Sequence, residues 1–289
     1  IRTILLQGSS VKSLTFLGDM FDGVQCPCIL LQLVATGKPL STAGMMIEDR
    51  TRTYTIAMER TVVPENFSFR MTDEEYRVLE KIKNSIPVCY LADHADFALG
   101  IVTGNNKKFL SAEKTEHSEM VLKGTDICKY HINPAKQYLR FEPEQFQQVA
   151  PLEIYRAPEK LLYRFISNQL VVAYDDRQML SLNSCNIVIP KIEGMQIKYI
   201  LAILNSSVSQ FVYQKEFHSI KVLRAHMEHI PIPRVGKAIQ NEIIAMTEPL
   251  ICGMGKEAAE TCQKRLDCRI MDLFRLSAEE QWIIRHALH

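Results

Sequence analysis

The sequence predicts an α+β protein, because strand-rich segments fill its first two thirds and a purely helical segment ends it. Apolar runs between turn residues indicate the strands, and apolar residues at helical spacing indicate the final helices. The chain has 289 residues, enough for one large or two ordinary domains. Its 47% hydrophobic and 23% charged residues exclude a disordered polypeptide.

Two apolar segments near the N-terminus predict strands. Val24–Val34 is a mostly apolar run between turn residues, and 52–58 alternates polar and apolar residues. We expect these strands to pair across the connection at 35–51, which holds glycine and proline. Thr72 with Glu75 then forms a capping box that starts a helix. Ile86-Pro87 ends this helix.

The middle of the chain predicts short strands joined by irregular turns. Its features are a strand from Phe97, turns at 104–106 and 123–126, strands at 160–166, 170–174 and 186–189, a helix from 196 to about 211, and an extended segment at 229–233. The C-terminal part predicts helices at 237–246 and 258–274, and a capping box of Ser277 and Glu280 opens a last one.

Charge and motifs exclude several functional classes. The net charge is +1, so the protein is not a globally basic nucleic-acid binder, although 97–235 carries a local excess of +4 (17 basic against 13 acidic residues). We find no phosphate-binding loop, zinc-protease or serine-hydrolase motif, and no metal site. We therefore predict no catalytic and no metal-binding residue. Eight cysteines without a signal peptide indicate reduced thiols in the cytoplasm, and no segment is long enough to span a membrane.

The remaining polar chemistry suits a nucleic acid. A glycine turn at 103–108 combines a hydroxyl, two amides and two ammonium groups, and Asn can pair with adenine while Lys contacts phosphate. Further basic residues lie on a predicted strand and in a polar stretch beyond 217. The candidate DNA-binding residues are Thr103, Asn105, Asn106, Lys107, Lys108, Lys129, Tyr130, Lys160, Arg164, Lys221 and Arg224.

The order of these motifs resembles the C-terminal part of bacterial DNA adenine-N6 methyltransferases of the TaqI-like group, and of the fused type IIG restriction–modification enzymes. The resemblance covers about 66–284. It rests on Gly100-Ile-Val-Thr-Gly-Asn-Asn-Lys-Lys-Phe109, Gly124-Thr-Asp-Ile-Cys-Lys-Tyr130, Pro158-Glu-Lys-Leu-Leu-Tyr-Arg164 with one inserted residue, Val172-Ala-Tyr-Asp-Asp176, Tyr199-Ile-Leu-Ala-Ile-Leu-Asn-Ser206, Ile230-Pro-Ile-Pro233 and 267–280, where Ile270 stands one residue early.

This resemblance implies a division of the chain into four parts. Residues 1–65 would be the end of an α/β methyltransferase domain, 66–96 a connecting helix and linker, 97–235 the target-recognition domain and 236–289 the C-terminal helices. The family's S-adenosylmethionine loop and Asn-Pro-Pro-Tyr motif are missing from the sequence. We therefore expect a fragment that recognises DNA without methylating it.

The resemblance also implies partners and cofactors. The chain itself would bind double-stranded DNA and the rest of its parent methyltransferase, with no membrane and no cofactor of its own. S-adenosylmethionine would belong to the parent, as would Mg²⁺ if the parent has a nuclease domain. Two alternatives stay open: a specificity subunit of a type I restriction system, and a non-enzymatic scaffold whose C-terminal helices bind a protein.

Overall fold

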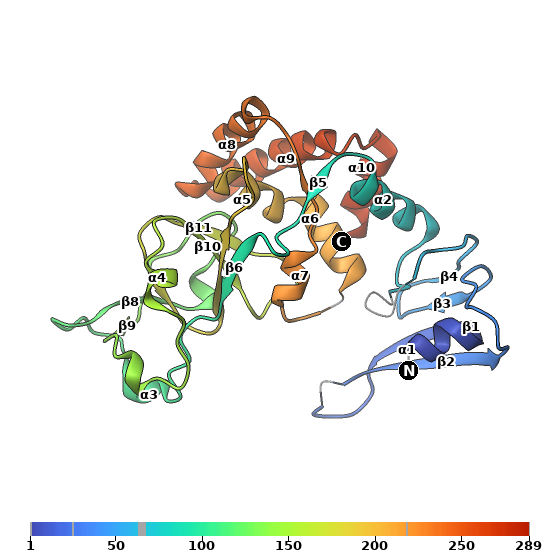
Figure 1. Ribbon diagram of the computed structural model, residues 1–289, viewed down its shortest axis with the longest axis horizontal. Helices are drawn as coiled ribbons and strands as arrows, with labels where there is room; N and C mark the ends of the chain where they lie inside the picture. The colour runs from blue at the N-terminus through green and yellow to red at the C-terminus, as the bar shows by residue number, and fades with distance from the viewer. Residues whose placement is uncertain (1, 25, 63–67, 218, 289) are drawn as a thin grey trace. The chain divides into compact units, whose positions relative to one another are not determined.

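The computed structural model describes residues 2–24, 26–62, 68–217 and 219–288 (Figure 1). It divides into two compact units, which we treat separately. Unit 1 comprises residues 1–80 with 215–217, and unit 2 comprises 81–214 with 218–289. Helices and strands mix in several small sheets, so the α+β class is confirmed. No helix among the described residues is long and apolar enough to cross a bilayer.

Unit 1 is built on a four-stranded sheet with the order β2-β1-β3-β4. Helix α1 (Arg2–Gly8) precedes strands β1 (Ser9–Asp19), β2 (Pro27–Ala35), β3 (Met46–Glu48) and β4 (Thr53–Thr55). The predicted direct pairing of the segments 24–34 and 52–58 is wrong, because β1 and β3 lie between them.

Strand β1 escaped prediction because a bulge changes its periodicity. Its register with β2 shifts between Val11 and Ser13, so the buried side chains Val11 and Leu14 stand three residues apart. Such spacing does not show the alternation expected of a strand. Beneath the sheet, Val11 and Leu14 pack with Met45, Ile47 and Phe69 in the core of unit 1.

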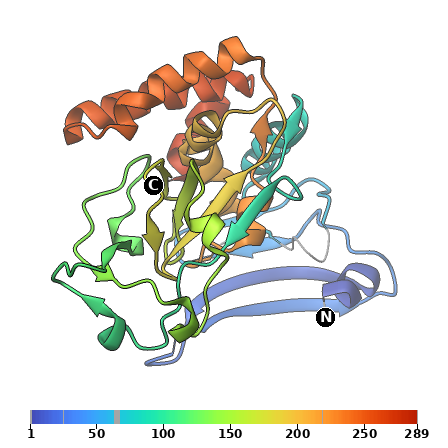
Figure 2. The same ribbon diagram turned by 60° about the vertical axis from the view of Figure 1, so that its left-hand side comes forward.

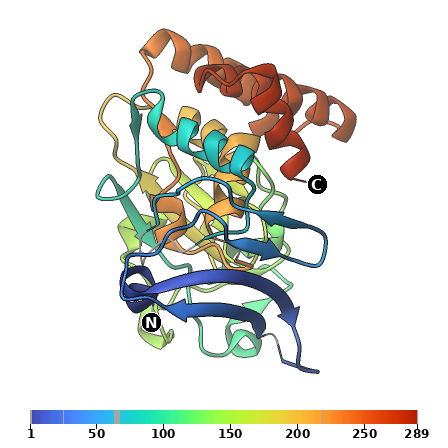
Figure 3. The same cartoon turned by 90° about the vertical axis from the view of Figure 1, so that its right-hand side faces the viewer.

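Strand β2 forms one edge of this sheet and is apolar but exposed. Figure 3 shows β1 and β2 as a long, curved antiparallel hairpin. Exposed apolar side chains occur on β2 at both odd and even positions, including Ile29 and Leu30 at 56% and 61%. Because neighbouring strand residues face opposite sides, β2 exposes apolar side chains on both faces, although Leu31 packs against the core of unit 1.

Helix α2 (Asp73–Asn84) begins at the predicted capping box. Glu75 N–H donates to Thr72 Oγ1 over 3.3 Å, and Thr72 N–H donates to Glu75 Oε2 over 2.8 Å. Asp73 forms a buried ion pair with Arg60, at 2.7 Å between Oδ1 and Nη2. This pair fixes the connection after β4 to the start of the helix.

Unit 2 contains two four-stranded sheets that share one apolar core. One has the order β11-β10-β13-β6, so β6 (Ala95–Ala98) is an edge strand beside β13 (Cys185–Pro190). The strands predicted at 160–166, 170–174 and 186–189 are confirmed in this sheet. Its central members are β10 (Lys160–Arg164) and β13, and β11 (Val172–Asp175) lies at the other edge.

The second sheet of unit 2 has the order β12-β8-β9-β7 and consists of very short strands. They are β7 (Leu110–Ser111), β8 (Glu119–Leu122), β9 (Tyr138–Leu139) and β12 (Leu180–Ser181). A separate pair joins β5 (Val88–Cys89) to β14 (Ile232–Pro233) within the predicted extended segment.

The longer helices of unit 2 follow the predictions with one break, and three helices of four or five residues were not predicted. The predicted helix from 196 to 211 is interrupted at Ser206, which separates α5 (Ile197–Asn205) from α6 (Ser207–Glu216). The Ser277–Glu280 capping box is confirmed at the start of α10. The other helices are α3 (Asn106–Phe109), α4 (Leu152–Tyr155), α7 (Arg224–Glu228), α8 (Lys237–Ile251), α9 (Lys256–Leu273) and α10 (Ala278–Ala287).

Candidate nucleic-acid interface

The predicted glycine turn at 103–108 is an ordered, exposed structure that ends in the short helix α3. Thr103 is buried, and its hydroxyl donates to Asn106 Oδ1 over 2.6 Å. Asn105 caps α3, because its Oδ1 accepts from Lys108 N–H over 3.2 Å. Gly104 has φ +76°, a conformation that favours glycine. The turn therefore holds its amide side chains in defined positions.

The segment 145–148 supports this turn from the side. Val102 and Gln148 exchange two backbone hydrogen bonds of 2.9 and 3.1 Å. Phe109 packs edge-on against Phe146, with ring centroids 5.3 Å apart. Within unit 2, Figures 1 and 2 show α3 at the end opposite α8 and α9. The turn is thus a firmly held projection of unit 2.

Two lysines of the turn present their charge to solvent. Lys107 is exposed and forms no hydrogen bond or ion pair within the described part of the chain. Lys108 Nζ lies over the Phe109 ring, 4.6 Å from its centroid, and reaches Gln145 Oε1 at 3.5 Å. No carboxylate neutralises either ammonium group among the described residues, so both are available to an anionic partner.

A groove runs along the free edge of β6 and meets the support of this turn. Its volume is about 580 Å³, and it is lined by 95–100 on one side, by 148–151 and Ile154 on the other, and by Arg224. Arg224 lies over the Phe97 ring, 5.2 Å from its centroid, and pairs with Glu228 at 2.7 Å. Gln148 lines the groove and also pairs with Val102. The fold therefore brings Arg224 and Gln148, which supports the 103–108 turn, to one groove.

Sequence reasoning did not identify the groove itself. Gln148, Leu99 and Leu152 are exposed on or beside it, but an isolated glutamine or leucine carries no local signal of binding. Gly100, which lines the groove, was included only as part of a motif. A Cβ atom there would lie 2.1 Å from the backbone oxygen of Leu182, so only glycine fits.

Lys160 and Tyr130 are wrong as DNA-contacting residues, because both are buried. Lys160 has no exposed surface, and its Nζ lies 2.5 Å from Asp175 Oδ2 and 2.6 Å from the Tyr155 carbonyl oxygen. Burial lowers the pKa of Lys160, while Asp175 opposes that shift. Tyr130 is 2% exposed and adopts φ +74°, and burial raises the pKa of its phenol.

Arg164 and Lys129 point inward and bind carbonyl oxygens. The Arg164 guanidinium donates to the carbonyls of Gly124 and Ile127 over 2.9 and 2.5 Å. Lys129 Nζ donates to the carbonyl of Asn205 over 3.3 Å, and burial lowers its pKa. These two residues hold the fold together. Lys221, by contrast, is exposed, as are Arg224 and the 105–108 part of the turn.

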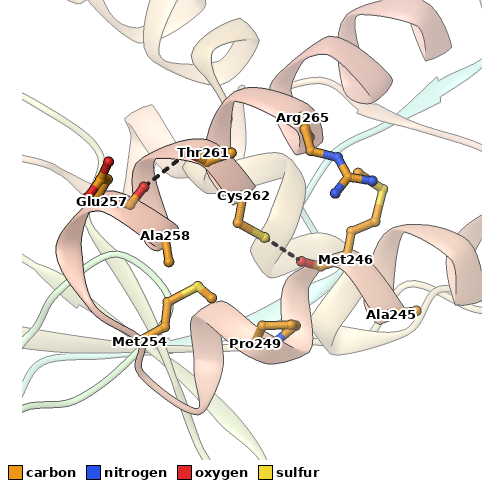
Figure 4. Close-up of a pocket in the computed structure, with 9 residues that line it drawn as sticks. All are labelled: Ala245, Met246, Pro249, Met254, Glu257, Ala258, Thr261, Cys262 and Arg265. Carbon is orange, nitrogen blue, oxygen red and sulfur yellow. Dashed lines mark hydrogen bonds between the residues drawn. The ribbon is translucent and has the colours of Figure 1, made fainter.

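A further hollow of about 620 Å³ lies between α8 and α9 (Figure 4). Its walls include Met246, Pro249 and Met254, and the Cys262 thiol is turned to the Met246 carbonyl oxygen at 3.3 Å. It is an apolar surface without a catalytic arrangement. No cluster of three or more His, Cys, Asp or Glu in the described ranges could hold a metal ion.

Comparison with known proteins identifies the class of the middle segment. Residues 119–232 match the family described as the TaqI-like C-terminal specificity domain. This match covers less than half of the chain and agrees with the resemblance that the sequence motifs carry. It includes the groove residue Arg224 but not the 103–108 turn. No curated protein matches the sequence.

One solved structure shares the fold, and two further ones match with lower TM-scores. The type IIL restriction–modification enzyme MmeI, solved in complex with DNA, superposes with a TM-score of 0.59 at 10% identity, covering 97% of this chain and 45% of MmeI. The type IIG endonuclease BpuSI gives a TM-score of 0.42 at 10% identity, with coverages of 94% and 44%. The HsdS subunit from Thermoanaerobacter tengcongensis gives 0.38 at 13% identity, with 75% and 50%. The chain spans about half the length of these proteins or less.

Proposed function

We propose that this chain is the sequence-specific DNA-recognition module of an adenine-N6 DNA methyltransferase or of a fused restriction–modification enzyme. The match of residues 119–232 to a TaqI-like specificity domain carries this proposal. The fold shared with MmeI, which was solved in complex with DNA, agrees with it. The exposed 103–108 turn and the groove at β6 give the module a surface that suits double-stranded DNA.

The chemistry of that surface separates anchoring from sequence readout. Lys107, Lys108 and Lys221 are exposed cations that suit backbone phosphates, which position a protein on DNA without reading its sequence. The amides of Asn105 and Asn106 are exposed beside them. Asn106 Oδ1 is engaged by Thr103, so its amino group remains a donor for an acceptor on a base edge.

Salt dependence of DNA affinity tests the anchoring role. The double variant K107Q/K108Q should flatten the dependence of log affinity on log salt by about 2, because each phosphate contact contributes about 0.9 to the slope. The matched control K237Q/K256Q removes two charges from the starts of α8 and α9 and should keep the slope. Fluorescence anisotropy with a labelled duplex measures both. An unchanged slope for K107Q/K108Q would exclude the turn from the interface.

The preference for one DNA sequence tests the readout role. Asn106→Asp keeps the oxygen that Thr103 binds but removes the amino donor. We expect it to lower the ratio of specific to non-specific affinity by about 1–3 kcal/mol, the value of one good base contact. A duplex selected for tight binding, compared with a scrambled duplex, provides the measurement. Equal losses on both duplexes would make Asn106 a general contact.

The methyltransferase parent is also part of the proposal. Strand β2 is apolar on both faces and lies exposed at a sheet edge, a pattern typical of strands covered on both sides in α/β sheets. We propose that the rest of the parent covers it and binds S-adenosylmethionine, with Mg²⁺ if a nuclease domain is present. The protein encoded by the full-length gene should methylate adenine in plasmid DNA, and the 289-residue chain alone should not.

A further inference from the structure

A polar cavity in unit 2 lies among α6, α9, α10 and the segment around Gln169. Its volume is about 560 Å³, within the range of small-molecule sites. Its lining includes Lys129, Ser207, Lys264, Asp267 and Arg285. It shares no lining residue with the groove at β6, and the DNA-recognition proposal does not use it.

Three buried polar side chains lie around Asp267, and one of them, Ser207, lines the cavity itself. Tyr130 Oη, Ser207 Oγ and Gln263 Nε2 are three of the four buried side-chain nitrogen or oxygen atoms that lack a hydrogen bond in the described ranges. Burial raises the pKa of the Asp267 carboxyl while contacts with Ser207 and Gln263 oppose that shift, and burial together with Asp267 raises the pKa of Tyr130, so all three residues lie near Asp267. Such atoms are rare in native proteins, because each costs free energy when buried alone.

The Ser207 hydroxyl, which lines the cavity, can donate a hydrogen bond to an acceptor on a bound molecule. Gln263 Nε2 can only donate, and the hydroxyls of Tyr130 and Ser207 each have a proton to donate. Asp267, the carboxylate beside these donors, accepts from Ser207 N–H over 2.9 Å at Oδ1 and has further acceptor sites for Gln263 and the Ser207 hydroxyl.

The charge of the lining favours an anion. Three cations, Lys129, Lys264 and Arg285, line the cavity against the single carboxylate of Asp267. Lys264 is exposed and has no hydrogen-bond or ion-pair partner in the described part of the chain. Arg285 Nη2 donates to Gln281 Oε1 over 3.1 Å and retains further N–H groups. Phosphate combines negative charge with several acceptor oxygens, as this lining requires.

We propose that this cavity binds a phosphate group, with Lys264 and Arg285 holding its charge and the Ser207 hydroxyl donating to one of its remaining acceptors. The phosphate could belong to a free nucleotide or to the DNA backbone, and the chemistry of recognition is the same. The interaction is a non-covalent one, and it is independent of the surface formed by the 103–108 turn.

Calorimetric titration of the full 289-residue chain with inorganic phosphate and with AMP tests the proposal. Lys264→Gln should weaken binding about tenfold, the effect of losing one charge-assisted hydrogen bond. Ser207→Ala removes the unpartnered hydroxyl while keeping the N–H that Asp267 binds, and it should weaken binding severalfold. Lys256→Gln removes the same charge at the start of α9, outside the cavity, and should bind as the unmodified chain does.

Titration with duplex DNA separates the two sources of phosphate. Binding of AMP that depends on Lys264 and Ser207 assigns the cavity to a free nucleotide. Absence of AMP binding, together with duplex binding weakened by both variants, assigns it to the DNA backbone. If neither variant changes the binding of phosphate, AMP or duplex, the proposal is overturned. K107Q/K108Q should lose duplex affinity and keep AMP affinity, so failure of the recognition surface and failure of this cavity give different results.

Discussion

Lys129 and Asp267 bind the two ends of one interrupted helix. Lys129 Nζ donates to the carbonyl of Asn205, the last residue of α5, and Asp267 Oδ1 accepts from the N–H of Ser207, the first residue of α6. A cation thus meets the negative end of α5 and a carboxylate meets the positive end of α6. The break at Ser206 is therefore stabilised by the segment around Lys129 on one side and by α9 on the other.

The buried carboxyl of Asp267 should make stability depend on pH. Burial raises its pKa above the ordinary value of 3.8, against the opposing effects of Ser207, Gln263 and Lys129. A carboxyl whose pKa is raised on folding favours the folded state at low pH, and this contribution is lost as pH rises through the folded pKa. The free energy of unfolding of Asp267→Asn, measured with urea, should therefore increase relative to that of the unmodified chain as pH rises above about 3.8. A constant difference across that range would contradict the assignment.

The ion pair of Lys160 with Asp175 should matter for stability alone. Both side chains are fully buried, so Lys160→Met leaves an uncompensated carboxylate and should destabilise the fold by about 3–5 kcal/mol. The double variant K160M/D175N should recover part of the loss, because it removes the uncompensated charge and the asparagine oxygen can still accept from one of the two N–H groups, of Arg177 or Met179, that bind Asp175. Thermal unfolding measures the change. A soluble, fully stable Lys160→Met that loses only DNA affinity would restore Lys160 as a phosphate contact.

Replacing Gly100, the glycine that lines the groove, should destabilise the fold. In Gly100→Ala the new Cβ would meet the Leu182 oxygen at 2.1 Å, so the strand edge must move and the fold should lose more than about 3 kcal/mol. Gly236→Ala is the matched control, because a Cβ atom there meets no atom within 4 Å. Chemical unfolding of both variants compares them. If the two variants are equally stable, the backbone beside β6 can move at little cost in free energy.

The exposed strand β2 should cause self-association when its covering partner is missing. Leu30 is 61% exposed in an edge strand, and such edges pair readily with other strands. Leu30→Lys should therefore reduce aggregation of the 289-residue chain, measured by light scattering, while thermal stability changes by less than about 0.5 kcal/mol. Lys12→Ala on the neighbouring strand β1 is a control that should not reduce aggregation. A destabilised Leu30→Lys would place Leu30 in a core instead.

Local sequence predicted those parts of the fold that local interactions hold. The capping boxes at Thr72 and Ser277 appear with the expected hydrogen bonds, because each needs only residues three positions apart. The strand at 160–166 and the C-terminal helices follow from continuous apolar runs or helical spacing. Strand β1 was missed because a bulge, which depends on its partner β2, places its buried residues three apart.

The candidate site likewise has features that local sequence predicts and features that depend on tertiary structure. The sequence by itself determined that a glycine turn with amides and lysines stands at 103–108, and the order of motifs indicated a specificity domain. Only the tertiary structure decided which basic residues face solvent. Lys107 and Lys160 have the same side chain, yet one is free and the other is enclosed beside Asp175. The physical reason is that burial and ion pairing depend on residues brought together by the sheet, such as β10 and β11, which no local pattern records.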